Sequence, residues 1–116
     1  METPPSLRAP TDADVQDAVA RLVEALDPLR VVVFGSAAWG GAGPGSDLDL
    51  LVVLPAVGDK RAARVEARRA LAGLDVAKDV VVTTPSEIDR RGWIVGTVLR
   101  EALGGRTVYE RATDAP

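Results

Sequence analysis

The feature that most restricts the fold is a pair of apolar segments separated by a glycine-rich connection. Residues 31–34 and 47–54 are short runs dominated by Val and Leu, as expected for buried β-strands. The connection between them holds five of the eleven glycines and no long predicted helix. A parallel strand pair normally needs a crossover of about a dozen residues or more, usually a helix. We therefore expect a mixed sheet rather than a wholly parallel one.

The other segments predict helices around a third strand. Thr11 and Asp14 form a capping signal for an amphipathic helix at 11–27. Apolar spacing and the Gly and Pro positions predict a short helix at 36–39, a helix at 60–74 and a strand at 80–82 that starts at or before Asp79. A further helix begins at Pro85, is interrupted at 91–92 and resumes at 94–103. An edge strand is predicted at 107–109. The fold class is α/β (α+β), a small mixed β-sheet covered by helices. We expect one domain at 11–112 between flexible segments at 1–10 and 113–116.

The residue composition restricts the chemistry. The 116 residues include no Cys and no His, which excludes a disulfide framework, a thiolate nucleophile, an imidazole base and a typical zinc site. Catalysis would depend on carboxylates, hydroxyls, Lys or Arg, or a metal held by oxygen. The net charge of −3 does not favour stable nucleic acid binding. Without a signal peptide or an apolar run of about 20 residues, we expect a cytoplasmic protein that does not bind membranes.

Two aspartates share one face of the second predicted strand. Asp47 and Asp49 point the same way because side chains alternate along a strand, and their Cα atoms are roughly 6.5 to 7 Å apart. Like charges held this close are costly unless a cation lies between them, and oxygen ligands favour Mg²⁺ or Mn²⁺. Asp79, at the head of the third strand, completes a carboxylate cluster if that strand lies beside the second. Asp75 is an alternative third ligand.

A Gly-Ser pair follows the first strand directly. Gly35 allows a sharp turn, and the Ser36 hydroxyl with the neighbouring amides could donate hydrogen bonds to a phosphate. Gly-Ser alone is more often a plain turn, and Asp-x-Asp alone is more often a solvated strand edge. Their combination, with ten residues between the pairs and apolar strands on both sides, is much rarer by chance and favours a phosphate and metal site.

These residues resemble a known family. Val33-Phe34-Gly35-Ser36 followed by Ser46-Asp47-Leu48-Asp49-Leu50, with Asp79 on a later strand, is similar to the DNA polymerase β-type nucleotidyltransferase superfamily, and the length resembles its minimal nucleotidyltransferase branch. The resemblance implies a nucleotidyltransferase fold in which the Gly-Ser turn holds the phosphates of ATP and three carboxylates bind two Mg²⁺ ions, or Mn²⁺. Carried over, the nucleotide-binding residues are Gly35, Ser36 and Ser46, and the catalytic and metal-binding residues are Asp47, Asp49 and Asp79.

The resemblance also implies a partner. Minimal nucleotidyltransferases are commonly encoded beside a helical protein of the HEPN type, with which they act as the antitoxin of a toxin–antitoxin pair. The expected activity is transfer of AMP to a tyrosine of that toxin within a hetero-oligomer. Two alternatives stay open: transfer to a small molecule, as in aminoglycoside-modifying relatives, and a binding-only antitoxin with a decayed site. The relatives that modify small molecules carry additional sequence for the acceptor, which disfavours the first alternative.

Three other features have alternative interpretations. Trp39 stands where many minimal members have Arg, so the nucleotide or partner contacts that the Arg makes in those members do not carry over to this chain. Trp39 could cover the core edge, stack on a base or contact a partner. The basic residues Arg61, Arg64, Arg68 and Arg69 indicate a solvated helix face, or otherwise a surface for a partner or acceptor. Trp93 and Tyr109 are interpreted as packing residues.

Overall fold

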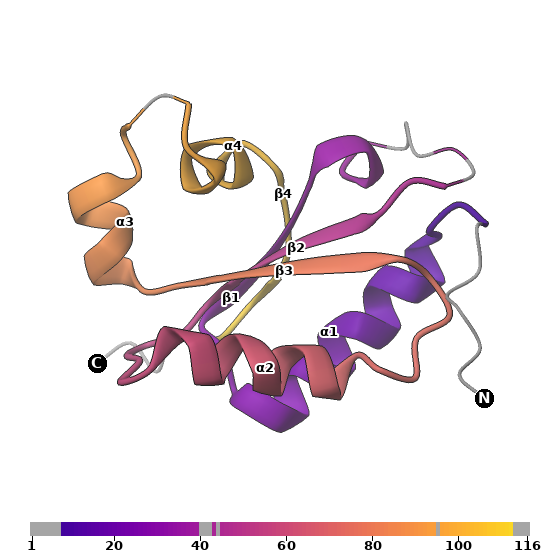
Figure 1. Ribbon diagram of the computed structural model, residues 1–116, viewed down its shortest axis with the longest axis horizontal. Helices are drawn as coiled ribbons and strands as arrows, with labels where there is room; N and C mark the ends of the chain where they lie inside the picture. The colour runs from indigo at the N-terminus through magenta and orange to yellow at the C-terminus, as the bar shows by residue number, and fades with distance from the viewer. Residues whose placement is uncertain (1–7, 40–42, 44, 95, 113–116) are drawn as a thin grey trace.

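The computed structural model describes residues 8–39, 43, 45–94 and 96–112. The expected terminal segments lie largely outside these residues. The elements, in chain order, are α1 (Asp12–Leu26), β1 (Arg30–Phe34), the 3₁₀ turn η1 (Gly35–Ala37), β2 (Leu48–Val53), α2 (Lys60–Ala70), β3 (Lys78–Thr83), α3 (Pro85–Arg91), α4 (Val98–Leu103) and β4 (Arg106–Glu110). Figure 1 labels the α-helices and the strands.

The four strands form one mixed sheet in the order β3-β2-β1-β4. β1 is antiparallel to both of its neighbours, whereas β2 and β3 are parallel. The expectation of a mixed sheet is therefore confirmed. The connections account for the difference, because the one from β2 to β3 contains the crossover helix α2, whereas the described residues between β1 and β2 form the 3₁₀ turn η1 and no α-helix.

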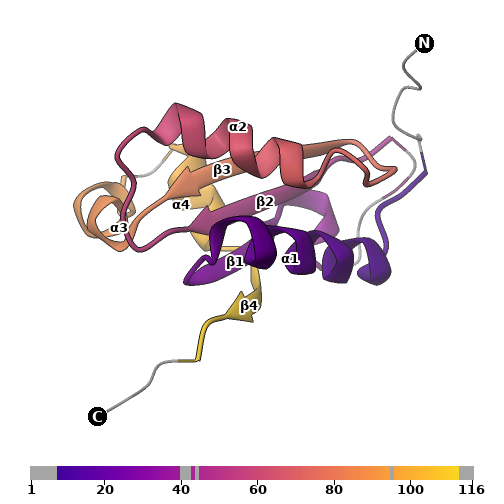
Figure 2. The ribbon, with the colours of Figure 1, turned by 90° about the horizontal axis from the view of Figure 1, so that it is seen from below.

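Helices cover both faces of the sheet. α1 and α2 lie together on one face, and α3 and α4 lie on the other (Figures 1 and 2). The alternation along β2 divides its side chains between two cores: Leu48, Leu50 and Val52 pack toward α1 and α2, whereas Leu51 and Val53 pack toward α4. Asp49 shares its face with Leu51, which places its carboxylate on the α4 side of the sheet.

The N-terminus of α1 is fixed by the predicted capping box. The Asp14 amide donates to the Thr11 hydroxyl at 3.3 Å, and the Thr11 amide donates back to the Asp14 carboxylate at 2.7 Å. Arg8 makes two further hydrogen bonds to this carboxylate, which hold the pKa of Asp14 well below its usual range. The nearly buried Asp14 is thereby kept charged and fully paired.

The structure differs from the sequence-based expectation between β3 and β4. α3 ends at Arg91, and α4 begins only at Val98 rather than at residue 94, with Thr97 capping it through a hydrogen bond from the Arg100 amide. Trp93 in this connection is 69% exposed, so its interpretation as a packing residue was wrong. Tyr109, in contrast, packs against the core beneath α1. None of the helices in the described part of the chain is long and apolar enough to cross a membrane.

Candidate active site

The glycine-rich turn and the first carboxylate strand meet at one end of the β1–β2 pair. Phe34, the last residue of β1, pairs with Asp49 of β2, so Gly35 lies directly beside the Asp49 side chain. Gly35 has φ +71°, and a Cβ atom there would lie 2.5 Å from Asp49 Oδ2. Both the left-handed backbone and the closeness of the carboxylate require glycine. The turn and the aspartate are therefore one structural unit.

Ser36 and Ser46 occupy different parts of this unit. Ser36 is exposed in η1, immediately after Gly35, which leaves its hydroxyl accessible to a ligand. The Ser46 hydroxyl instead accepts a hydrogen bond from the Gly43 amide at 3.1 Å, and the Ser46 amide donates to the Gly43 carbonyl at 3.0 Å. Ser46 thus closes the turn that leads into β2. Of the two serines, Ser36 is the one presented to solvent.

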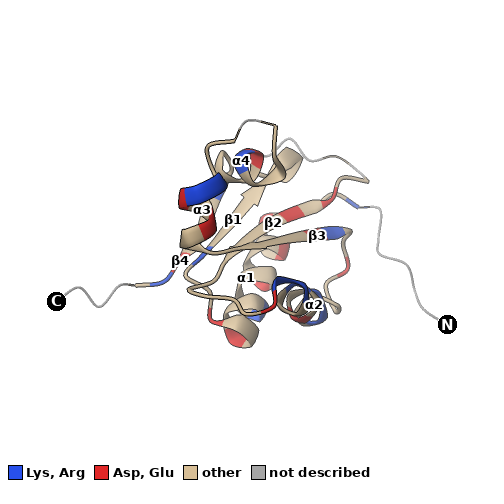
Figure 3. Ribbon diagram, turned by 60° about the vertical axis from the view of Figure 1, so that its left-hand side comes forward, with Lys and Arg blue, Asp and Glu red and all other residues tan. Residues whose placement is uncertain are grey.

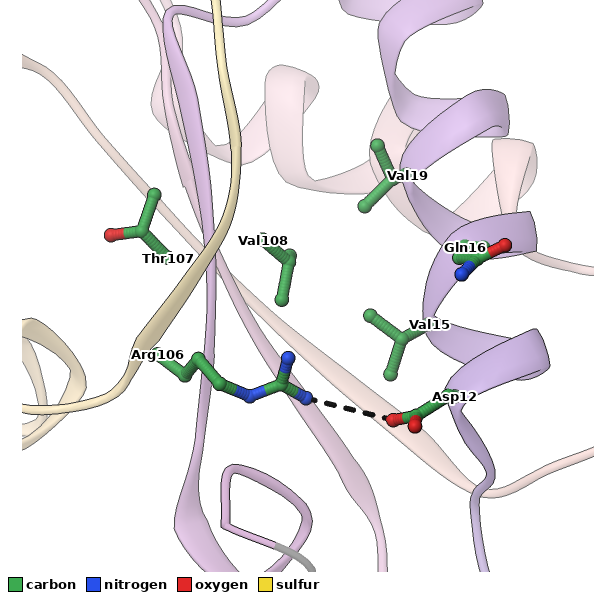
Figure 4. A pocket seen from close by; sticks show the side chains of 7 residues that line it. All are labelled: Asp12, Val15, Gln16, Val19, Arg106, Thr107 and Val108. Carbon is green, nitrogen blue, oxygen red and sulfur yellow. Dashed lines mark ion pairs between the residues drawn. The ribbon is translucent and has the colours of Figure 1, made fainter.

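The η1 turn is also tied to the far edge of the sheet. The Arg106 Nε atom, in β4, donates to the Ala38 carbonyl oxygen at 2.7 Å, directly after η1. The same guanidinium lies 3.8 Å from the Asp12 carboxylate, across a pocket between α1 and β4 (Figure 4). Sequence reasoning missed this role, because no local pattern connects two residues 68 positions apart.

The three predicted aspartates lie at the same end of the sheet. Asp47 immediately precedes β2, Asp49 lies in β2, and Asp79 pairs with Asp49 in the parallel register of β2 and β3. In parallel strands, residues in register direct their side chains to the same face. The predicted adjacency of Asp49 and Asp79 is therefore present in the fold, and it depends on the crossover connection through α2.

Asp49 carries the strongest electrostatic signature of the site. Burial, together with the negative charges of Asp47, Asp79 and Glu101, raises the pKa of its carboxyl to about 6, and burial is the largest cause. Glu101 comes from α4, on the same side of the sheet, and was not among the sequence-predicted residues. Its position in an exposed helix about fifty residues later gave no motif that could have identified it. The site thus has an excess of negative charge.

The Asp79 carboxylate is paired with two arginines of α2. Arg64 and Arg68 of α2 each place a guanidinium nitrogen 3.3 Å from Asp79 Oδ1, and the Val80 amide donates to the same oxygen at 3.0 Å. Within the part of the chain that the structure describes, no three carboxylates form a group that could hold one metal ion. The structure thus places Asp49 beside the turn, with Asp47 close enough for its charge to act on Asp49, and Asp79 lies between Asp49 and the arginines.

The alternative ligand, Asp75, lies in a different electrostatic environment. Asp14 is the main cause of the raised pKa of Arg8, and the charge of Asp75 adds to it. Burial lowers the pKa of Lys78, and the charge of Asp75 opposes that shift. Asp75 is not among the groups that shift the pKa of Asp49. Asp79 is the residue in register with Asp49. Of the two alternatives, the register favours Asp79.

The chemistry of the donor set fits a hard divalent cation. Asp47 and Asp49 supply carboxylate oxygens, and the raised pKa of Asp49 marks a charge that a cation would stabilise. Asp79 could join them by exchanging its contacts with the two arginines, both of which are substantially exposed. The Asp47 and Asp49 carboxylates thus have hydrogen-bond donors for a phosphate on one side and the open edge of the sheet on the other.

Comparisons with known proteins agree with this chemistry. The family model for a nucleotidyltransferase domain matches residues 15–106. A crystal structure of a protein from Sulfolobus solfataricus, assigned as a nucleotidyltransferase, is similar to this chain with a TM-score of 0.52 and 26% sequence identity, covering 67% of this chain and 70% of that chain. No curated protein sequence is significantly similar. The match to the family model spans most of the chain, including the turn and all three aspartates, and the chain therefore belongs to the nucleotidyltransferase family.

Proposed function

We propose that this protein is a Mg²⁺-dependent nucleotidyltransferase that transfers AMP from ATP to a tyrosine hydroxyl of a HEPN-type toxin, acting as the antitoxin of the pair. One observation supports the proposal: Asp49 lies against the Gly35-Ser36 turn, Asp47 is two residues before it, and Asp79 lies in register with Asp49 at the open side of the sheet. Hydrogen-bond donors for phosphate, carboxylates that could hold divalent ions and a place for an acceptor therefore adjoin one another.

The proposed reaction exchanges one phosphorus–oxygen bond for another. The acceptor oxygen forms a bond to the α-phosphorus of ATP while the bond from that phosphorus to the oxygen bridging the β-phosphate breaks. AMP remains on the acceptor as a phosphodiester, pyrophosphate leaves, and the hydroxyl proton passes to a carboxylate or to water. Such transfers depend mainly on positioning and charge compensation rather than on a covalent enzyme intermediate.

Each site residue has a role in this scheme. The η1 amides and the Ser36 hydroxyl would donate to the phosphates of ATP. Asp47, Asp49 and Asp79 would hold the divalent ions, which supply charge neutralisation at the phosphates and acidify the attacking hydroxyl when bound. Asp79 lies nearest the open edge of the sheet, where an acceptor could approach, and this position supports a role for its carboxylate in taking the hydroxyl proton.

The proposal is tested with the purified protein and a HEPN-type helical protein encoded beside it; a neighbouring gene of another kind would contradict the proposed pairing. The pair is incubated with labelled ATP and Mg²⁺, and the partner is analysed by mass spectrometry. We expect AMP on a tyrosine of the partner, and loss of this modification in Asp47→Asn or after addition of EDTA. Asp89→Asn, an exposed carboxylate change on α3, is the matched control and should retain activity.

The same assay separates the alternatives. Tight binding of the partner without modification would support a binding-only antitoxin and contradict enzymatic transfer. Labelling of an aminoglycoside but of no protein would support a small-molecule acceptor. A folded Asp47→Asn variant with full activity would remove the catalytic assignment, whatever the acceptor is.

A further inference from the structure

A groove of about 520 Å³ runs along the outer edge of β3. We call it the β3 groove. Its floor is the strand from Val80 to Val82, Arg61 and Arg64 of α2 line one side, and Val98 at the start of α4 lines the other. Asp79 lies at its end, beside Asp49. The groove therefore leads along the sheet edge to the proposed active site.

The floor of the groove presents main-chain groups. β3 is an edge strand, and among the strands that the structure describes it pairs with β2 alone. The carbonyls of Ala77 and Thr83 accept hydrogen bonds from β2, so the odd-numbered residues of β3 direct their backbone toward β2 and the even-numbered ones toward the open edge. The Val80 amide on that edge is capped by the Asp79 carboxylate. The backbone of Val82 faces the groove, while its side chain is buried in the core.

An edge of this kind can accept an added strand. Extended peptides bind exposed sheet edges through main-chain hydrogen bonds, and the flanking side chains provide specificity. The apolar contribution here is Val98, which is 55% exposed at the rim, together with the partly buried Val81. Both the free backbone and the apolar rim fit an extended polypeptide better than a compact small molecule.

The charge of the groove selects the occupant. α2 carries five basic residues and one acidic residue, in a chain with a net charge of −3 (Figure 3). On the groove side, Lys60 is paired with Glu87 and Arg64 with Asp79. Among the residues that the structure describes, Arg61 has no ion pair. An exposed guanidinium at the rim of a groove whose other charged side chains are paired favours a carboxylate on the ligand.

We propose that the β3 groove binds an extended acidic segment of the acceptor polypeptide, which pairs with the free edge of β3 and presents its hydroxyl beside Asp79. This inference rests on the proposed nucleotidyl transfer to a protein, and it specifies the chemistry of the protein segment that is recognised. Arg61 binds an acidic side chain of the segment, and Val98 contacts an apolar one.

Binding is measured first, without nucleotide, so that docking is separated from catalysis. The probe is a fluorescein-labelled glutamate–tyrosine copolymer, and a lysine–tyrosine copolymer serves as the control probe. We expect the acidic copolymer to bind and the basic one not to bind. Arg61→Glu should weaken binding by about tenfold at low salt, because it replaces an attraction with a repulsion. Arg69→Glu, on the same helix but outside the groove, is the matched control and should weaken binding by less than about threefold.

A second measurement tests the strand edge directly. Hydrogen exchange of the 80–83 backbone should slow when the acidic copolymer is added, because the Val82 amide would gain a partner. Equal weakening by Arg61→Glu and Arg69→Glu would show non-specific attraction of a polyanion and overturn the proposal. Binding without protection of β3 would also overturn it, as would absence of binding.

Transfer is then assayed with the same copolymer, labelled ATP and Mg²⁺. We expect AMP on its tyrosines, a higher KM for the copolymer in Arg61→Glu, and an unchanged kcat. Asp47→Asn should bind the copolymer normally and transfer nothing. If binding and edge protection are present but no protein acceptor is ever modified, the proposed function fails and the docking site stands. If a partner protein is modified equally by wild type and Arg61→Glu, the docking site fails and the proposed function stands.

Discussion

The two halves of the candidate site are built in different ways. The turn half consists of η1, Asp47 and Asp49, and it is formed by a short connection between adjacent antiparallel strands. The acceptor half consists of Asp79 and the arginines of α2, and it is brought to the turn by a crossover between parallel strands. The turn half is closely packed, as the space around Gly35 shows, whereas the acceptor half is open to solvent. Substitutions in the turn half should therefore have the larger effects.

Asp49→Asn should have the largest effect on activity. It removes a carboxylate that the proposed function assigns to the divalent ions, and we expect transfer to fall by about 10³-fold or more. The variant should fold, because the pKa of the Asp49 carboxyl is raised to about 6. Its ionised form is therefore less favourable in the folded protein than in the unfolded chain, and removing the charge does not destabilise the fold. Without metal, the free energy of unfolding should rise by about 1 kcal/mol or less after solvent screening. Transfer assays and denaturant titrations check both expectations.

The control for this variant is Asp75→Asn, at the alternative third ligand. Its transfer rate should stay within about twofold of wild type, because the charge of Asp75 does not act on Asp49. An Asp75→Asn variant as inactive as Asp49→Asn would assign the third carboxylate to Asp75. The acceptor half would then have to be rebuilt around it.

Gly35→Ala should have the second largest effect. A non-glycine residue at φ +71° costs about 1 to 2 kcal/mol, and the new Cβ would lie 2.5 Å from Asp49 Oδ2, so the aspartate or the turn must move. We expect transfer to fall by about 10²-fold, since displacement of a positioned group by about 1 Å has costs of this order. The transfer rate and the melting temperature are the measurements.

Gly45→Ala separates strain from displacement. Gly45 also has a positive φ, +83°, but a Cβ there would meet nothing within 4 Å. Its free energy of unfolding should fall by about 1 kcal/mol, with little change in transfer. Equal losses of activity in the two alanine variants would show that backbone strain alone, and not the contact with Asp49, is responsible.

The same contrast explains what could be predicted from sequence. The alternation of Asp47, Leu48 and Asp49 and the Gly35-Ser36 turn are local patterns, and the mixed sheet followed from the length of one connection. The start of α4 at Val98 was not predicted, because its cap, Thr97, follows a segment in which apolar spacing suggested an earlier start. Glu101 and Arg106 reach the site only through tertiary packing, so no local signal marks them.

Arg106→Met tests whether that long-range contact matters. The variant keeps an apolar stem in the pocket of Figure 4 but loses the hydrogen bond to the Ala38 carbonyl, which should lower the free energy of unfolding by about 1 kcal/mol. Because η1 would be less well held, KM for ATP should rise by about tenfold or less with little change in kcat. Arg106→Lys should restore part of the loss. Asp12→Asn, which removes only the partner at 3.8 Å, should behave like wild type.

The smallest effect on stability is expected in the acceptor half, from the double variant Arg64→Met and Arg68→Met. Both guanidinium groups and the Asp79 carboxylate are about half exposed, and ion pairs of this kind contribute about 0 to 1 kcal/mol. We expect a change in the free energy of unfolding below about 1 kcal/mol and a larger effect on KM for the acceptor than on kcat, measured by denaturant titration and by initial rates. A fall in kcat as large as that of Asp49→Asn would place these arginines in the chemistry itself. The two halves of the site would then be a single catalytic unit, joined through Asp79.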